Sequence, residues 1–561
     1  MLRIALLSPL LFSFALPAIA QSAAPPPTAL YVAGTVVEEP GSHPLKKVLV
    51  QIVSETQAQT ASYAATTDSD GHFRVDNIAP GRYRVFFEKS GFAGVNSRSQ
   101  RSEVNVITVQ AGKPGDDFVF QMLPTAAITG RVTDEDGDPM SNVRVIIQKK
   151  IPGKSRRATV TAVGTNDLGE YRAAGLFPGQ YWVAAVPPPD PRDYERPAKN
   201  PPPAQQAEDQ PEIRYVTEYY PGTTDISQAT PIALKAGDET PVNMALVPSR
   251  TYRIRGVVAS LLPGQRPSVE LASKNGDAAA GTEVASDGSF ELHGVAPGSY
   301  VLKSFSTAES SVLTARQDVT VTASDVDGEK LIPMPDFTIS GHLRADARST
   351  LDLSQFSVNL RAADVGDDTG FFKTEDSFGE NAQVDRQGNF SWKHVNPGNY
   401  IVRLYGGSGQ DSFFLKSAHV GANNIDAAFS LNGPVVLDLV ISDKGGIVEG
   451  IVTDRNRQGE DQQGTDAPVP NAEVVAVPEA KYRNIPERFG EGATDQFGRF
   501  TIRGLAPGSY TLFAWQDVGD DLYRDPDFLK SQEADGTTAK IEEGSHQTLV
   551  LRLSPVGDNW E

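Results

Sequence analysis

One spacing pattern recurs five times along the chain and indicates the size of its folding units. Each copy has a glycine, an aromatic residue two positions later, an aliphatic residue at position seven, Pro-Gly at positions nine and ten, and a tyrosine at position twelve. The lead glycines lie 98, 119, 100 and 110 residues apart and are Gly71, Gly169, Gly288, Gly388 and Gly498. Such distances match independent domains rather than solenoid repeats, so the pattern predicts a tandem array of five units.

Within each copy, the residue types predict two short strands. In four copies an Asp or Asn stands three positions before the lead glycine, where its side chain can cap a turn while the glycine takes positive φ. Phe73 and Val75 alternate with His72 and Arg74, as in a half-buried strand. Pro-Gly suits a type II turn, which would reverse the chain. We therefore expect a hairpin in each copy, with the tyrosine on its second strand.

A second signal lies 32 to 48 residues upstream of each lead glycine, where another glycine stands among β-forming residues. These strand glycines are Gly34, Gly130, Gly256, Gly341 and Gly450. Short strands separated by Gly and Pro turns, without a helical period between them, are typical of all-β proteins. The sequence predicts an antiparallel β-sandwich of roughly seven strands in each unit.

Two stretches near the C-terminus carry a family resemblance. Thr494-Asp495-Gln496-Phe497-Gly498-Arg499-Phe500 precedes Gly504-Leu505-Ala506-Pro507-Gly508-Ser509-Tyr510, and an Asn-Ala-x-Val element begins at Asn471. This pattern resembles the carboxypeptidase regulatory-like domain family. The resemblance implies five tandem copies of a transthyretin-like (prealbumin-like), carbohydrate-binding-like β-sandwich. Units three and four keep only the second half of the pattern clearly.

The repeats and the composition between them suggest domain boundaries. We expect a signal peptide (1–20), a Pro-rich tether (21–29), unit one (30–124), unit two (125–249) with a Pro-rich insertion (187–211), unit three (250–334), unit four (335–442), unit five (443–555) and a tail (556–561).

The N-terminus predicts export. Arg3 precedes an apolar stretch, and Ala18-Ile19-Ala20 forms a small-residue cleavage site, as in secretory signal peptides. A periplasmic or extracellular location follows. The chain has no cysteine, which excludes disulfides and a lipoprotein anchor, and its net charge of -20 disfavours nucleic acid and direct membrane insertion.

The sequence offers no support for an enzyme, a cofactor or a metal site. No histidine has Glu three residues later, as a zinc carboxypeptidase would need, and no nucleophile elbow or P-loop occurs. Asp134 to Asp138 resembles the start of a calcium loop, but Val145 stands at the twelfth position, so an acidic turn is favoured. An isopeptide cross-link, known in the similar collagen-adhesin B-type domains, is not predicted, because Lys46 or Lys47 has no counterpart in unit two.

Sugar binding is the specific activity that the aromatic residues favour. If Tyr181 and Tyr510 face the core, alternation turns Trp182, Phe513 and Trp515 outward, where flat rings can stack on pyranose faces. Further ligand candidates, in or beside loops, are Tyr219, Tyr220 and Tyr523, whereas Trp392 is expected in the core. The alternative is that these outward rings pack against a neighbouring unit or an overlying loop.

The sequence as a whole predicts an exported, non-catalytic binding protein whose partner is a glycan or an envelope protein. Carbohydrate binding through the outward aromatics is the first hypothesis. A structural stalk or protein-interaction scaffold, and an accessory to a separate peptidase, are the alternatives.

Overall fold

The computed structural model describes residues 30–39, 41–55, 62–94, 105–111, 113, 115–150, 157–188, 212–259, 267–273, 278–308, 311–346, 351–363, 380–406, 412–425, 428–454, 466–483, 485–516 and 518–556. The expected signal peptide and tether lie outside the described residues. So do the Pro-rich insertion and the tail, apart from residues 187, 188 and 556.

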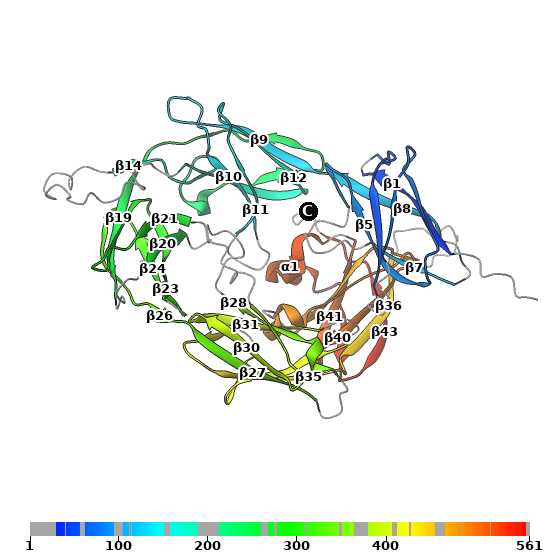
Figure 1. The fold of residues 1–561 in the computed structure, drawn as a ribbon. Coiled ribbons are helices and arrows are strands. Elements are labelled where there is room, and N and C mark those ends of the chain that lie inside the picture. Colours follow the sequence, from blue (N-terminus) through cyan, green and yellow to red (C-terminus); the bar gives the residue numbers. More distant parts are fainter. Residues whose placement is uncertain are drawn as a thin grey trace, which may run out of the picture.

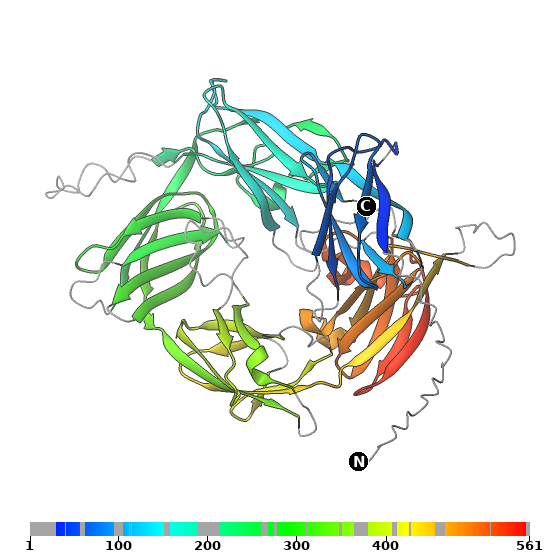
Figure 2. The same ribbon diagram turned by 45° about the vertical axis from the view of Figure 1, so that its right-hand side comes forward.

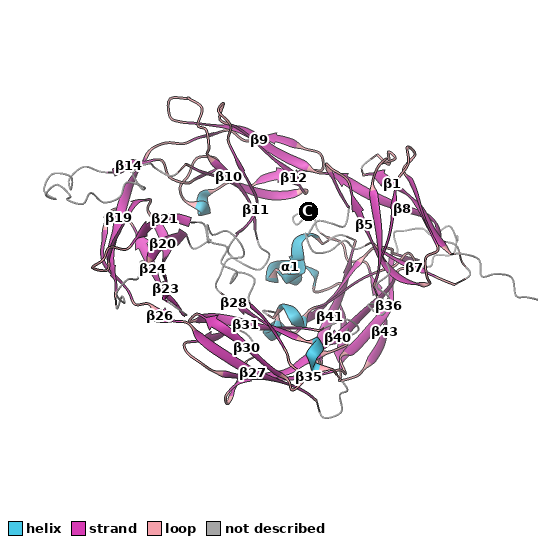
Figure 3. Cartoon of the chain, viewed as in Figure 1, coloured by secondary structure: helices cyan, strands magenta, loops and turns pink. Residues whose placement is uncertain are grey.

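Strands dominate the described chain and form ten sheets, two in each unit (Figure 3). One sheet of each unit contains the strand glycine and is called here the glycine sheet. The other contains the repeat tyrosine and is called the tyrosine sheet. The predicted all-β array of sandwiches is confirmed, with one difference: each glycine sheet includes a parallel strand pair beside its antiparallel ones.

Units one and two have the following strand orders. The glycine sheet of unit one runs β4 (His72–Asp76), β1 (Tyr31–Glu38), β8 (Gly115–Pro124), β6 (Phe92–Gly94), and its tyrosine sheet runs β3 (Ser62–Thr66), β2 (Leu49–Ser54), β5 (Gly81–Glu88), β7 (Val106–Val109). The glycine sheet of unit two runs β12 (Glu170–Leu176), β9 (Ala126–Thr133), β17 (Glu239–Pro241), with β18 (Met244–Ala245) also beside β9. Its tyrosine sheet runs β11 (Arg157–Gly164), β10 (Arg144–Lys150), β13 (Gly179–Val186), β15 (Glu218–Tyr219), with β16 (Ile232–Leu234) also beside β13.

The glycine sheet of unit three includes one strand, β14 (Glu212–Arg214), from the residue range expected for unit two. This sheet runs β14, β19 (Ser249–Val258), β22 (Ser289–Val295), with β25 (Val326–Leu331) also beside β19. The tyrosine sheet of unit three runs β21 (Ala278–Glu283), β20 (Ser268–Ser273), β23 (Gly298–Ala308), β24 (Ser311–Val321), β26 (Met334–Pro335). Because β14 pairs with β19, the residues directly after the Pro-rich insertion belong to this sheet.

Units four and five complete the array. In unit four the glycine sheet runs β30 (Asn389–Val395), β27 (Phe337–Ala345), β35 (Val436–Ser442), β32 (Phe414–Val420), β33 (Asn423–Asn424), and the tyrosine sheet runs β29 (Glu380–Gln383), β28 (Ser357–Ala362), β31 (Gly398–Tyr405), β34 (Phe429–Leu431). In unit five the glycine sheet runs β37 (Ala467–Pro468), β36 (Gly446–Asp454), β40 (Arg499–Leu505), with β43 (His546–Arg552) also beside β36. Its tyrosine sheet runs β39 (Gly490–Ala493), β38 (Glu473–Pro478), β41 (Gly508–Trp515), β42 (Thr537–Ile541).

Short helices join some of these strands. The described α-helix is α1 (Pro526–Gln532), and the described 3-10 helices are η2 (Ile226–Gln228), η3 (Leu353–Gln355), η5 (Ala480–Tyr482), η6 (Pro486–Arg488) and η7 (Gly519–Arg524).

The predicted repeat hairpin is wrong. In unit one β4 pairs with β1 and β5 pairs with β2, so the two strands of the repeat lie in different sheets and the chain crosses the sandwich between them. The type II turn is wrong too. The Pro-Gly glycine has no positive φ in units one, three and four, and its φ values of 147° at Gly179 and 159° at Gly508 are far from the roughly 80° that a type II turn needs there. The residue six positions after the lead glycine takes positive φ instead, with φ values of 59°, 78°, 71°, 62° and 74° at Asn77, Gly175, Gly294, His394 and Gly504.

The turn at the lead glycine follows the prediction. All five lead glycines have φ between 71° and 89°. In unit five the Asp495 carboxylate accepts hydrogen bonds from the backbone N–H groups of Phe497 and Arg499, at 2.9 and 3.0 Å. Asp68, Asn166 and Asp385 cap the same turn in units one, two and four. This cap holds the chain as it enters the strand that follows.

The strand glycine and the repeat aromatic face each other across two paired strands. Gly34 lies opposite Phe73 and Gly450 opposite Phe500, and the other three units have the same register. A Cβ on Gly450 would come within 1.8 Å of the Leu549 carbonyl oxygen and 3.0 Å of the Phe500 ring. Only glycine therefore lets the neighbouring strand β43 come this close while the aromatic ring lies over the same position.

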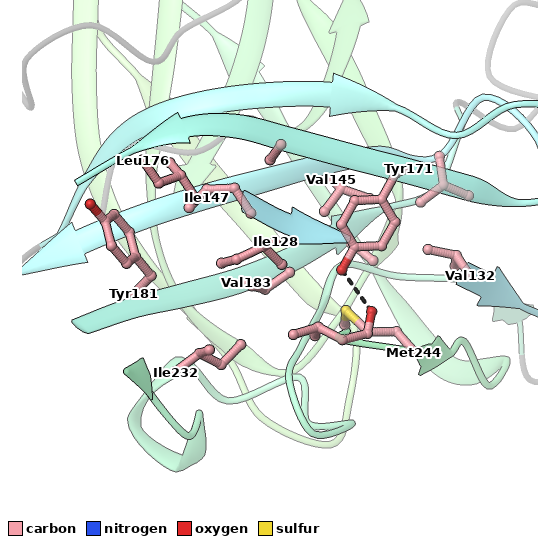
Figure 4. Packing of buried hydrophobic residues seen from close by; sticks show 14 of the residues in the cluster. Ile128, Val132, Val145, Ile147, Tyr171, Leu176, Tyr181, Val183, Ile232 and Met244 are labelled. Atoms are coloured by element: carbon pink, nitrogen blue, oxygen red, sulfur yellow. Dashed lines mark hydrogen bonds between the residues drawn. The ribbon is translucent and has the colours of Figure 1, made fainter. Parts of the chain in front are cut away.

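The repeat tyrosine closes each core with a hydrogen bond back to the corner. Its hydroxyl donates to the carbonyl oxygen four residues earlier in all five units, at 2.7 to 2.9 Å. Figure 4 shows Tyr181 in the core of unit two, together with Tyr171, whose hydroxyl donates to the Val242 carbonyl at 2.7 Å. The tyrosine thus fixes the crossing between the two sheets of the sandwich.

The five units follow one another around a closed ring (Figures 1 and 2). Unit one, drawn in blue, lies beside unit five, drawn in orange and red. Glycine-sheet strands such as β9, β19, β27 and β43 lie on the outside, and tyrosine-sheet strands such as β10, β20, β31 and β41 lie toward the centre. The helix α1 lies within the ring, next to β41. The outward faces of the tyrosine sheets therefore point to the ring's centre.

Candidate functional site

The predicted aromatics of unit five lie on the ring-facing side of β41 but are sealed beneath the segment that contains α1. Trp515 is fully buried, its ring stacks on Phe513 with centroids 5.1 Å apart, and Phe528 of α1 covers it at 5.6 Å. The indole N–H donates to the Gln532 side chain at 3.0 Å. These rings form a second hydrophobic core, outside the sandwich.

The sequence of this segment explains why it packs there. Asp525 caps α1 by accepting from the N–H groups of residues 527 and 528, and Pro526 occupies the first turn, where its missing N–H is not needed. Tyr523 is buried, and its hydroxyl donates to Glu491 at 2.8 Å. The segment buries the outward rings and satisfies their polar atoms at the same time.

In unit two the corresponding aromatic is covered differently. Trp182 is 9% exposed, and the Arg157 guanidinium lies 4.4 Å from its ring centroid. Burial lowers the pKa of Arg157. Within the part of the chain that the structure describes, the buried indole N–H of Trp182 has no hydrogen-bond acceptor. Tyr219 is buried in a small cluster on the same face, and Tyr220 packs against the sandwich core.

Strand alternation was predicted correctly, since Tyr510 faces the core while Phe513 and Trp515 face away from it. Trp392 lies in the core, as expected. The assumption of open ring faces does not hold in this structure. A sugar platform needs an accessible ring, and the predicted ligand residues are buried or half-buried, so sugar binding through them stays an untested prediction.

The acidic turns behave as capped turns. The Asp134 carboxylate accepts from the N–H groups of residues 136 and 138, at 3.1 and 2.8 Å. Asp68, Asp70 and His72 place ligand-type atoms within 4.8 Å of one another at an exposed position. Since Asp68 already accepts from the N–H groups of residues 70 and 72, this cluster is part of the capping geometry.

Polar contacts join successive units. Between units one and two, the N–H of Gly237 donates to the Pro124 carbonyl at 3.0 Å. Between units three and four, the N–H of Val312 donates to Asp336 at 3.1 Å. Between units four and five, the Ser442 hydroxyl donates to Glu543 at 2.8 Å. Together with the β14–β19 pairing, these contacts orient each unit on the next.

A further contact, which the sequence analysis did not predict, joins unit one to unit five and closes the ring. Arg82 pairs with Glu55 of its own unit and donates to the carbonyl oxygen of Ala493 in unit five at 2.6 Å. Its guanidinium also lies 3.9 Å from the carboxylate of Asp495, whose side chain is only 3% exposed. We call the residues of this interface, which also includes Thr108 and Gln496, the closing contact.

Gln496 completes the closing contact by pairing with the backbone of Thr108, as a neighbouring strand would. Its amide donates to the Thr108 carbonyl at 2.8 Å and accepts from the Thr108 N–H at 2.9 Å, while the Thr108 hydroxyl donates to Asp495 at 2.7 Å. Thr108 lies on β7, the last strand in its sheet. The side-chain amide therefore satisfies the backbone groups of an edge strand.

One sequence signal could have indicated this interface. The position between the glycine and the tyrosine of the repeat is Arg82, Gln180, Ser299, Asn399 and Ser509 in the five units. Only unit one carries a charge there. An exception at a variable position of an otherwise regular repeat marks a unit-specific contact.

The fold and these surfaces define an array of β-sandwich domains held in a ring. Residues 31–122 and 127–188 match the model of the carboxypeptidase regulatory-like domain, and the first two units belong to that family. The matched residues do not include units three to five, although these share the geometry of the repeat. No curated protein matches the chain.

Several solved structures match the chain at low sequence identity. The Bacillus anthracis TIE protein is 9% identical, with 75% of each chain covered and a TM-score of 0.17. The Streptococcal ancillary pilin is 11% identical over 54% of this chain and 99% of its own, with a TM-score of 0.17. GBS52, the minor pilin of Streptococcus agalactiae, is 14% identical over 42% of this chain and 99% of its own, with a TM-score of 0.22. Likeness at these values carries no functional argument.

Among the residues that the structure describes, no helix combines the length and the apolar composition needed to cross a bilayer.

Proposed function

We propose that this chain is an exported, non-catalytic scaffold at the cell envelope, which presents the outer surfaces of a ring of five β-sandwiches to partner proteins. The observation that supports this function most is the closing contact. Five direct hydrogen bonds join units one and five and hold the ring closed: two from Arg82, to the carbonyl oxygens of Ala493 and Arg499, and three between Thr108 and the side chains of Asp495 and Gln496. A ring does not extend as a stalk does, so the scaffold is preferred to the stalk.

Sugar binding through unit two is the second candidate. The specific observation in its favour is the buried indole N–H of Trp182, which has no acceptor among the described residues and could donate to a hydroxyl. Arg157 over the ring would have to move aside to admit a pyranose. Trp515 supports this candidate less, because its indole already donates to Gln532.

Binding of the fluorescently labelled chain to an isolated envelope fraction tests both candidates. Binding that survives added sugars and is abolished by protease treatment of the envelope supports the scaffold. Binding that sugars compete away, and that Trp182→Ala removes while Trp515→Phe keeps, overturns the scaffold in favour of a glycan-binding protein. A peptidase that co-purifies in fixed proportion supports the third alternative, an accessory subunit.

A further inference from the structure

The closing contact is the one junction of the ring that no chain connection supports. Successive units are joined covalently, whereas Thr108 and Gln496 are 388 residues apart in sequence. The described hydrophobic clusters each lie within a single unit, so none of them joins unit one to unit five. The chain has no cysteine that could lock this junction covalently. Hydrogen bonds and charge therefore hold the ring closed.

The two sides of this junction are different surfaces. Unit one contributes an edge strand and the Arg82 guanidinium, and unit five contributes the capped turn at Asp495 and Gln496. Such a heterologous interface is complementary to a copy of the other side and not to itself. A chain whose ring is open presents both sides, one at each end of its array.

We propose that the closing contact is exchangeable: it closes the ring within one chain, and it joins unit one of one copy to unit five of a second copy, head to tail. The same hydrogen bonds and the same Arg82–Asp495 attraction are available in both arrangements. Within one chain the contact is favoured at low concentration, because the two surfaces are tethered. At high concentration the second copy competes, as in domain swapping.

Cysteines placed beside the contact, in a full chain that has none of its own, test the proposal. Gln110→Cys lies two residues after Thr108 and Phe497→Cys directly after Gln496, and both leave these hydrogen-bonding residues in place. With a flexible bis-maleimide, the double variant should cross-link within one chain in dilute solution. A concentrated mixture of the two single variants should cross-link between chains. The matched control replaces Phe497→Cys by Gln387→Cys, the equivalent position of unit four.

Gln496→Ala removes two hydrogen bonds and should lower both kinds of cross-linking about tenfold. Arg84 lies on the same strand as Arg82 and shares the Glu55 carboxylate with it, but it is 58% exposed and is not part of the closing contact, so Arg84→Ala should change neither. Cross-links within chains at every concentration, with none between chains above the Gln387→Cys control, would overturn the exchange. Absence of both kinds, in variants that sediment as folded chains, would overturn the closing contact itself.

Discussion

Unit two and unit five turn aromatic side chains toward the centre of the ring from the same face of the tyrosine sheet, yet they cover them differently. In unit five a capped helix adds a second core, and the Trp515 indole has an acceptor. In unit two a cation lies over Trp182, whose indole N–H has none among the described residues. Strand alternation decides where a ring points, but the covering segment decides whether the ring is structural or available.

The comparison predicts its largest effect at the two tryptophans. Trp515→Ala should destabilise unit five by about 3–5 kcal/mol, because it empties a fully buried site. Trp182→Ala should cost less, about 0.5–3 kcal/mol in unit two, because its ring is covered by the Arg157 side chain and does not belong to a second hydrophobic core like that around Trp515. Hydrogen exchange of the strands in each unit is the measurement, since a chain of five units need not unfold in one step. Equal losses in the two units would contradict the comparison.

A buried threonine that both units share should have the same effect on stability in each. Thr494 accepts from the N–H of Ala472 and donates to the Val469 carbonyl, both at 2.7 Å, and Thr165 makes the equivalent bonds in unit two. Valine keeps the shape but leaves a buried donor and a buried acceptor unpaired, which costs about 1–3 kcal/mol. Thr494→Val and Thr165→Val should therefore each accelerate hydrogen exchange in their own unit, and by a similar factor. If the two substitutions had very different effects, the two units would differ in overall stability and not only in how their ring-facing aromatics are covered.

The repeat tyrosine gives a prediction that depends on pH. Burial raises the pKa of Tyr181 to about 12, from about 10 in the unfolded chain. Its phenol therefore contributes stability that is fully present below pH of about 10 and is lost as the pH rises through about 12. Tyr181→Phe should lose about 1 kcal/mol at neutral pH, with the hydrogen bond to Phe177. The variant should also show a shallower alkaline loss of stability, measured by denaturant titration at stepped pH.

The smallest expected effect concerns the cation over Trp182. Arg157→Ala removes an interaction worth about 0.5–1 kcal/mol at partly exposed sites and should open the indole to solvent. Exchange in β11 and β13 should increase slightly, and unit five should not change. If Arg157→Ala creates binding of a free oligosaccharide that the parent chain lacks, unit two is a sugar site closed by this arginine. Lys149→Ala, a cation near the ring of Tyr181 instead, is the control.

The regular parts of the fold could be predicted from the sequence because each depends on a single local effect. The lead glycine, the capping Asp and the strand alternation are local effects, and all three were predicted correctly. The hairpin was wrong because a Pro-Gly pair shows only that the chain turns. The turn does not determine whether the strand after it pairs with the strand before it or crosses to the other sheet. In unit one the outcome depends on distant strands, because β4 pairs with β1 and β5 pairs with β2.

The candidate site could be predicted only in part. The direction of Trp515 follows from the parity of its strand, but its cover comes from α1, which is not part of the repeat. The closing contact could be predicted even less from local sequence. Arg82 and Gln496 stand at variable positions of the repeat, and they meet only because of how the five units are oriented. Such contacts need the relative placement of domains, which alternation and turn residues do not determine.

The closing contact also decides how the molecule would carry mechanical load. If the two ends of the array are pulled apart, tension passes from unit one directly into unit five through Arg82, Thr108 and Gln496. Units two, three and four lie in a parallel path and bear little force while these bonds hold. If the contact ruptures before any sandwich unfolds, the chain gains length abruptly while its five domains stay folded.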